Sequence, residues 1–401
     1  MERTITNREA TELQAQVITK AHTHIPALTG VRFFAVFHIF MFHLWVLYDM
    51  EKPEKFSDLM SGYSRLPDTL ITFFSHGWMS TSFFFILSGF ILAYIYWDKD
   101  GNIVGGDKRF WLRRIGRLYP IHIIVMLVTF LFIGSYYLSF RSLTDLLPSA
   151  IGTLALVQSW YPPWVPEWNW PAWTISALAF LYFIMPFLCR QLAKLSRKQM
   201  FIVLLLLPII SLLPTVVYSF YFPHGSEPIQ NWQIFLGSTP LFWLAQFSSG
   251  MLLSRAFGIS RFSNSWRKDS GKKFAWGDIA LLVLIATACF TTIKEPLKFF
   301  VRHGLLMPLF WIIILDFARG NGLAARLFSL PGTGFFGETA YSLFIWQNMA
   351  MALCWSTAAS FSGTGYQQVW AAPLGLALFS VISTYWIEKP IARKLRRKFE
   401  H

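Results

Sequence analysis

Residues 28–43, LTGVRFFAVFHIFMFH, form an apolar run with one arginine near its start and one histidine at its end. Arg32 and His43 are eleven residues apart. In an α-helix this spacing exceeds three turns by only about 20° and corresponds to roughly 16 Å along the axis, so both side chains are expected on one face. Ionisable groups at membrane depth usually face a protein interior or a watery cavity, and they mark function.

The composition is that of a membrane protein. The 401 residues are 54% hydrophobic and only 14% charged, and the mean hydropathy is +0.44. These values exclude an ordinary soluble domain. A net charge of +14 would suggest nucleic acid in a soluble protein, but the basic residues lie in short segments between apolar runs, where they set orientation. We therefore expect membrane lipid around the chain and no nucleic-acid partner.

The sequence offers ten runs that are long enough for a bilayer crossing, which needs about 20 helical residues. A shorter run, 148–159, is expected to be re-entrant or interfacial. The pattern predicts an all-α fold, a polytopic membrane bundle of about ten transmembrane helices. The predicted spans are 27–48, 72–97, 118–138, 171–189, 201–220, 236–254, 276–293, 300–317, 335–358 and 369–387.

The distribution of basic residues predicts the orientation. With a cytoplasmic N-terminus, the inside segments hold 27 Lys and Arg and the outside loops hold 6. Such a bias is typical of an even number of crossings with both termini in the cytoplasm. The predicted organisation is a cytoplasmic N-terminal segment 1–26, one transmembrane domain 27–388 and a basic cytoplasmic tail 389–401.

Six short motifs follow one another along the chain and resemble the marks of one family. They are LTGVR with His43 eleven residues after its arginine, FFFILSGFILAY at 83–94, RRIGRLYP at 113–120, PAWTISALAFLYFIMP at 171–186, TAYSLFIW at 339–346 and WIEKP at 386–390. Together they resemble the acyltransferase-3 family over residues 26–396. The resemblance implies a multi-pass protein of the bacterial inner membrane that transfers an acyl group, usually acetyl from acetyl-CoA, to a sugar hydroxyl. The implied partners are acyl-CoA and a glycan or glycolipid acceptor in a surface polysaccharide, lipopolysaccharide or glycoside.

His43 is the expected catalytic base, because a neutral imidazole can accept the proton of a sugar hydroxyl during attack on a thioester. It also matches the functional histidine of the family. Arg32 is expected to bind a phosphate of the cofactor or the oxygen that gains charge in the reaction. The alternatives are a hydrogen-bonded histidine inside the bundle and an arginine that extends to the lipid headgroups. His38 lacks the motif match and is expected to be structural.

Arg114 and Arg117 lie one helical turn apart in the densest basic cluster and match the basic residues before the family's YP. We expect them to bind the phosphates of acetyl-CoA. The alternative is that they serve only topology and contacts with anionic lipid. Ser88 and Gly89 in the SGF motif are small, so they are expected to permit close approach of two helices, and the alternative is that they face a cavity and contact a ligand.

The fourth predicted span departs from the family pattern. The family usually has a glutamate two residues beyond Ser176, where this chain has Leu178, and it often has a histidine at the position of Gln347. Glu167, in the loop YPPWVPEWNW, is the candidate substitute carboxylate, and the alternative is a solvated loop residue. The tryptophans of this loop are expected to form an interfacial belt, with sugar stacking as a second interpretation.

The sequence contains no pattern of metal ligands, and the histidines are scattered, so no metal is expected. No motif of a covalent acyl-enzyme is present either, which favours direct attack by the acceptor. Two other functions stay open. One is a membrane transporter or flippase for a glycan or lipid, and the other is a non-catalytic acyltransferase homologue.

Overall fold

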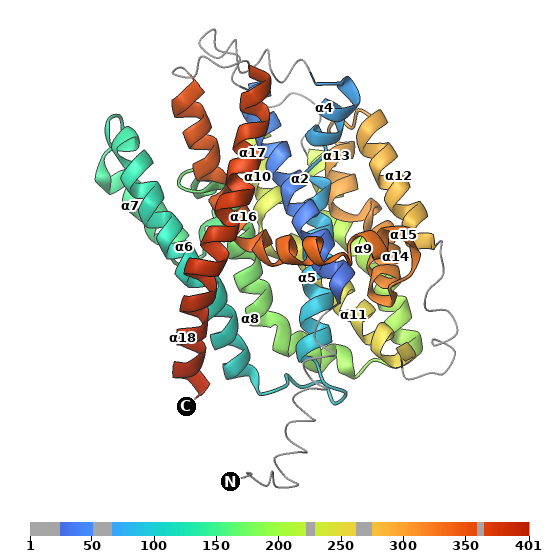
Figure 1. Ribbon diagram of the computed structural model, residues 1–401. Coiled ribbons are helices and arrows are strands. Elements are labelled where there is room, and N and C mark those ends of the chain that lie inside the picture. Colours follow the sequence, from blue (N-terminus) through green and yellow to red (C-terminus); the bar gives the residue numbers. More distant parts are fainter. Residues whose placement is uncertain (1–24, 51–65, 222–228, 262–274, 359–364, 401) are drawn as a thin grey trace, which may run out of the picture.

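The computed structural model describes residues 25–50, 66–221, 229–261, 275–358 and 365–400, and these contain helices and turns but no strand (Figure 1). The predicted all-α class is therefore confirmed. The long helices are α2 (Pro26–Met50), α5 (Met79–Tyr96), α6 (Asp107–Leu138), α8 (Trp173–Ala193), α9 (Arg197–Tyr221), α11 (Leu244–Arg261), α12 (Trp276–Phe290), α14 (Met307–Arg319), α16 (Pro331–Ala358) and α17 (Gly365–Ile382). Shorter helices are α4 (Asp68–Ser75), α7 (Leu143–Leu154), α10 (Ile229–Ser238), α13 (Leu297–Phe300), α15 (Gly322–Leu327) and α18 (Lys389–Glu400), with π-helical segments at Val301–Leu305 and Ser383–Glu388.

Within the described ranges, seven helical segments are long and apolar enough to cross a membrane. They are Pro26–Leu47, Met79–Tyr96, Asp107–Phe132, Trp170–Ala193, Arg197–Tyr221, Leu297–Arg319 and Val369–Leu395. The other three predicted spans, 236–254, 276–293 and 335–358, fall on α10 with α11, on α12 and on α16. Of these, α12 has only 15 residues. The structure supports a multi-pass membrane protein, while ten crossings and the cytoplasmic position of both termini stay predictions.

The span predicted at 72–97 is divided into two helices, α4 and α5, which meet at Gly77. A Cβ atom on Gly77 would lie 2.1 Å from the carbonyl oxygen of His38. The chain therefore breaks where it packs directly on the backbone of α2. The run predicted as re-entrant or interfacial, 148–159, forms the end of α7 and the turn after it. Most of the predicted N-terminal segment 1–26 lies outside the described residues.

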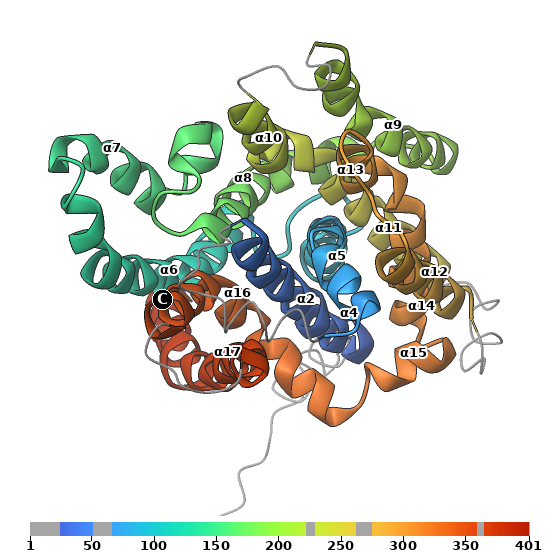
Figure 2. The ribbon, with the colours of Figure 1, turned by 90° about the horizontal axis from the view of Figure 1, so that it is seen from above.

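Helices α2 and α5 lie near the centre of the molecule, with the others around them (Figure 2). Helix α11 packs on α5 through glycines, since a Cβ on Gly89 would lie 2.0 Å from the carbonyl oxygen of Phe247. A Cβ on Gly250 would lie 1.9 Å from that of Ile86. The close approach expected from the SGF motif is thus confirmed, and it holds the two backbones in direct contact.

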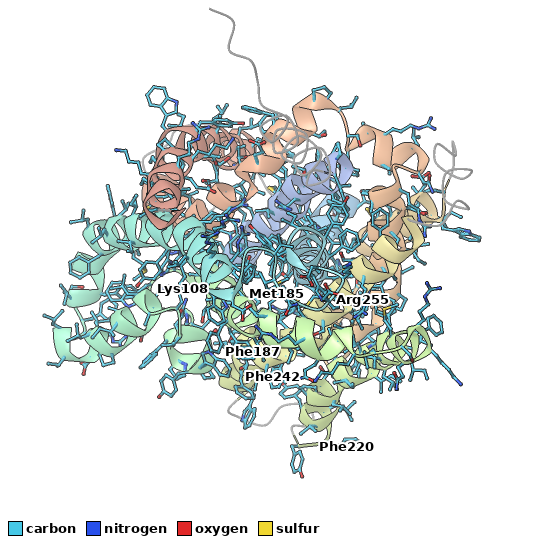
Figure 3. The ribbon with its side chains drawn as sticks, turned by 90° about the horizontal axis from the view of Figure 1, so that it is seen from below. Lys108, Met185, Phe187, Phe220, Phe242 and Arg255 are labelled. Atoms are coloured by element: carbon cyan, nitrogen blue, oxygen red, sulfur yellow. The ribbon has the colours of Figure 1, made fainter. Side chains whose placement is uncertain are left out.

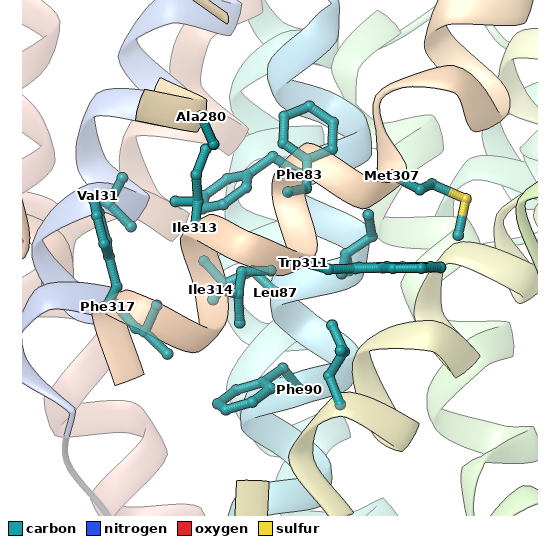
Figure 4. Close-up of a cluster of buried hydrophobic side chains, with 14 of the residues drawn as sticks. Val31, Phe83, Leu87, Phe90, Ala280, Met307, Trp311, Ile313, Ile314 and Phe317 are labelled. Atoms are coloured by element: carbon teal, nitrogen blue, oxygen red, sulfur yellow. The ribbon is translucent and has the colours of Figure 1, made fainter. Parts of the chain in front are cut away.

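A buried apolar cluster joins α2, α5 and α14 (Figure 4). Phe83, Leu87 and Phe90 of α5 face Ile314 and Phe317 of α14. The outside of the bundle is also apolar, most clearly on α9, where Phe220 is 80% exposed and extends from the periphery (Figure 3). An apolar surface of this kind suits contact with lipid chains.

Candidate active site

A cavity of about 550 Å³ opens at the end of the bundle where α6 begins and α18 lies. We call it the basic cavity, because six basic side chains and only two glutamates line it. The basic residues are Arg32, Arg109, Arg113, Arg114, Arg117 and Lys389, and the glutamates are Glu338 and Glu388. Three of the predicted site residues, Arg32, Arg114 and Arg117, are thus brought together. The excess of positive charge suits a ligand that carries several phosphates.

The arginines of the basic cavity are held by few polar contacts. Arg114 donates to the hydroxyl of Tyr96 over 2.8 Å, and its guanidinium lies 5.1 Å from the centre of that ring. Arg117 lies 3.9 Å from the carboxylate of Glu388, which also accepts a 3.0 Å hydrogen bond from Ser342. Arg32 forms no ion pair with any described residue, so its charge remains available to a ligand.

Leu178 lines the basic cavity together with Thr174 and Ile175. The position at which the family usually has a glutamate therefore belongs to the cavity that contains Arg32. His43 is not among the residues that line this cavity. A carboxylate at position 178 would add a third acidic group to this cavity, whereas the leucine leaves six basic side chains with two glutamates.

His43 lies deeper in the bundle, beside Gln347 of α16. Its Nδ1 is 3.1 Å from Oε1 of Gln347, and Gln347 is completely buried. With the amide oxygen of Gln347 as acceptor, Nδ1 of His43 is the donor and Nε2 keeps a free lone pair. The orientation of the His43 ring is thus set by a residue that the sequence marked only as a departure from the family. By contrast, both nitrogens of His38 are bonded, to Ser80 and to the carbonyl of Phe73, as expected of a structural histidine.

Trp170 stacks on His43 with 6.2 Å between the ring centres and 29° between the planes. Two amides fix the loop that carries it, since Asn169 donates to the carbonyl of Ile345 and Asn348 donates to that of Trp168. Trp168 is 2% exposed and Trp170 is 38% exposed. The loop therefore inserts into the bundle instead of forming only an interfacial belt, and Trp170 is its accessible aromatic face beside His43.

Glu167 lies in the same loop, but its carboxylate pairs with Arg141 over 2.7 Å. The carbonyl of Glu167 accepts a hydrogen bond from Tyr137. The described contacts of this carboxylate do not include His43. Glu167 is thus held by a residue of α6 and by one in the turn between α6 and α7. The hydrogen-bond partner of His43 is Gln347.

The basic cavity ends one helical turn before His43. Its last lining residues on α16 and α8 are Phe344 and Thr174, and Gln347 and Trp170 lie about one turn, some 5 Å, further on. Phe84 and Phe344 line this end and stack in parallel, with 6.2 Å between ring centres and 7° between planes. Arg32 lines the basic cavity together with this aromatic pair, whereas His43, on the same helix, does not line it.

Among the described residues, no group of three or more His, Cys, Asp and Glu side chains is arranged to hold a metal ion. Two further polar residues were not identified from the sequence as parts of a site. Glu388 contacts Arg117 in the basic cavity, and Arg302 lies against Trp173, which is three residues after the Trp170 that stacks on His43. The WIEKP motif contains Glu388, but nothing local indicates its partner.

Comparison with known proteins gives a family model described as an acyltransferase domain, which matches residues 25–389. The acyltransferase MdmB of Streptomyces mycarofaciens is 31% identical over 182 residues, covering 44% of this chain and 42% of that protein. The putative peptidoglycan O-acetyltransferase YrhL of Bacillus subtilis is 23% identical over 95% of this chain and 57% of its own length. The peptidoglycan O-acetyltransferase OatA of Listeria monocytogenes is 22% identical over 92% of this chain and 56% of its own.

The chain thus spans about half the length of the curated relatives that it matches. No solved structure matches it. Two of these relatives are named O-acetyltransferases and the third is named an acyltransferase.

Proposed function

Because the chain belongs to the acyltransferase-3 family, we propose that it is a membrane O-acyltransferase that moves an acyl group, represented by acetyl, from acyl-CoA to a sugar hydroxyl. The observation that carries the proposal is the pairing of a cavity rich in arginine with an oriented histidine one turn beyond it. The proposed location is the bacterial inner membrane, with the basic cavity open to the cytoplasm, as the distribution of basic residues predicts.

The donor binds in the basic cavity. Arg114 and Arg117 contact the phosphates of acyl-CoA, and Arg32, which is deeper on α2, binds a phosphate nearer to the thioester or the thioester oxygen itself. The pantetheine arm then extends toward Phe84 and Phe344. These rings separate to let the thioester reach His43, because they occupy the end of the cavity.

The acceptor hydroxyl attacks the thioester carbonyl beside His43. A new C–O bond forms, the C–S bond breaks, and Nε2 of His43 takes the hydroxyl proton. Gln347 keeps the ring in the required tautomer. The imidazolium then returns its proton to the departing CoA thiolate, so the enzyme ends as it began. Glu167 has no step in this scheme, because its carboxylate is engaged by Arg141.

Trp170 provides the surface for the acceptor. Its ring is partly exposed and lies against His43, and the faces of sugar rings stack on aromatic side chains. The acceptor is therefore a glycan or glycolipid that reaches His43 from the end opposite the basic cavity. Two relatives are named for peptidoglycan, which makes a peptidoglycan-type glycan the first acceptor to test.

The test is an assay of purified protein with acetyl-CoA labelled in the acetyl group and peptidoglycan fragments as acceptor. Label recovered on the glycan with release of CoA supports the proposal. Movement of the acceptor across a vesicle membrane without consumption of CoA would support a transporter instead. Binding of the glycan with neither reaction would support a non-catalytic homologue.

A further inference from the structure

Arg302 lies in the π-helical segment Val301–Leu305, inside a predicted span. Its guanidinium lies 5.6 Å from the centre of the Trp173 ring and 5.3 Å from that of Trp243, and it donates to the carbonyl of Gly237 over 3.2 Å. Its Nε is enclosed and has no hydrogen-bond partner, and no described carboxylate forms an ion pair with Arg302. A cation at this depth normally has an anionic partner, because desolvation of an unpaired charge is costly.

The backbone around Arg302 is held in place by side chains of two other helices. Ser82 of α5 donates to the carbonyl of Arg302, and Gln246 of α11 donates to the carbonyls of Arg302 and His303, each over 3.1 Å. These bonds satisfy carbonyls that the π-helical turn leaves without their usual partners. The backbone at Arg302 is therefore fixed by contacts with α5 and α11, so the fold determines where this arginine lies.

Lys298 lies four residues before Arg302, one turn closer to the end of the segment. Its Nζ is 5.9 Å from the centre of the Phe42 ring and 6.0 Å from that of Trp78. Glu295 acts on its charge but does not form an ion pair with it. Among the described residues, the close partners of both cations are thus aromatic faces and backbone carbonyls.

Aromatic rings lie between both cations and His43. The ring centre of Phe42, which Lys298 approaches, is 5.5 Å from that of His43. Trp173, beneath Arg302, lies one turn after Trp170, which stacks on His43. The two cations thus lie against aromatic residues next to His43 and Trp170, and neither cation lines the basic cavity.

We propose that Lys298 and Arg302 form an anion subsite for the acceptor, so that the preferred acceptor carries a carboxylate or phosphate close to the hydroxyl that is acylated. The inference rests on the proposed function and deepens it by giving the charge class of the acceptor. A fixed cation pair would orient an anionic acceptor over Trp170 and would favour it over a neutral sugar of the same shape.

The test compares three acceptors at saturating acetyl-CoA. They are a neutral oligomer of N-acetylglucosamine, an oligomer of the same length with a lactyl carboxylate on alternate sugars, and the neutral sugar linked to a prenyl phosphate. The variants are Lys298→Gln, Arg302→Gln and the charge-preserving Arg302→Lys. Lys294→Gln is the matched control, because Lys294 is an exposed lysine one turn earlier.

The inference predicts that Lys298→Gln and Arg302→Gln raise the KM for an anionic acceptor by about tenfold, the change that corresponds to the loss of one modest charge contact. The KM for the neutral oligomer and for acetyl-CoA stays within about twofold. Arg302→Lys retains most of the preference, and Lys294→Gln behaves like the unchanged protein. Added salt weakens the preference for the anion in the unchanged protein and has little effect in the Gln variants.

Comparison of the two anionic acceptors shows whether the subsite binds a carboxylate on the sugar or the phosphate of a lipid carrier. The acceptor whose anion reaches both cations should have the lower KM. An equal loss of kcat with neutral and anionic acceptors would overturn the inference, because it would assign Arg302 to the reacting oxygen or to the packing. Equal use of all three acceptors by the unchanged protein would also overturn it. Consumption of no acetyl-CoA with any acceptor would instead refute the proposed function itself.

Discussion

The Nδ1 of His43 lies 3.1 Å from Oε1 of Gln347, and this contact determines which nitrogen of the imidazole can act as a base. The two residues are 304 positions apart in the chain. Their helices, α2 and α16, pack along each other through the core. With the amide oxygen accepting a hydrogen bond from Nδ1–H, Nε2 has no proton and keeps its lone pair. In the proposed mechanism Gln347 therefore has the orienting role that a carboxylate fills in many catalytic histidine pairs.

Replacement of Gln347 tests this role. Gln347→Leu removes the acceptor for Nδ1, and we expect kcat to fall at least about tenfold because both the tautomer and the ring orientation lose their support. Gln347→Glu keeps an oxygen acceptor of the same length and should retain most of the activity. Initial rates with labelled acetyl-CoA at saturation give the comparison. A Leu variant with unchanged kcat would show that the contact does not matter for the reaction.

The basic cavity predicts how the donor binds. Arg114→Gln and Arg117→Gln should each raise the KM for acetyl-CoA by about tenfold, with a smaller change in kcat, because each removes a charged contact to a phosphate. The same variants should leave the KM for acetyl-pantetheine, which has no phosphates, unchanged. Lys108→Gln is the control, since Lys108 is an exposed cation of the same helix that does not line the cavity. An equal effect of Lys108→Gln would point to general surface charge.

Phe84 and Phe344 close the basic cavity toward His43. Phe84→Ala removes one ring of the stack and opens a path for water to the thioester. We expect slow hydrolysis of acetyl-CoA without acceptor to rise severalfold while transfer to the glycan falls. The ratio of released CoA to acylated glycan measures this uncoupling. A ratio that stays at one in the variant would mean that the ring pair does not separate donor and acceptor.

The contact of α5 with α11 predicts the effect of a single methyl group. Gly89→Ala would place a Cβ 2.0 Å from the carbonyl oxygen of Phe247, so the helices must separate, and we expect a destabilisation of roughly 3 kcal/mol. Gly375→Ala is the matched control, because nothing lies within 4 Å of a Cβ there. Thermal unfolding in detergent, followed by loss of the monodisperse peak, checks both variants. Equal melting temperatures would contradict the packing.

The sequence was sufficient for the helical class, for the family and for three of the five arginines of the basic cavity. Hydrophobic runs and basic segments are local signals, and the RRIGRLYP motif places Arg114 and Arg117 one turn apart. The exact division of spans was harder to predict. The break at Gly77 depends on the backbone of α2, and the number of crossings is not visible in hydropathy alone where helices such as α12 are short.

The partners within the site could not be predicted, because they come from distant parts of the chain. Gln347 contacts His43 from 304 positions away, and only the packed bundle brings them together. Glu167 was a reasonable substitute carboxylate by its place beside the tryptophans, but the sequence does not indicate that Arg141 engages it. The sequence marks Leu178 only as a departure from the family pattern, and it does not indicate that this residue lies in the wall of the basic cavity.

The most direct measurement is transfer of labelled acetyl from acetyl-CoA to a glycan by the His43→Ala variant, beside the unchanged protein. The account predicts loss of transfer, by a factor of about 10² or more, with the binding of acetyl-CoA intact, because the base is removed and the basic cavity is not touched. Transfer by His43→Ala at a rate comparable to that of the unchanged protein would contradict the account.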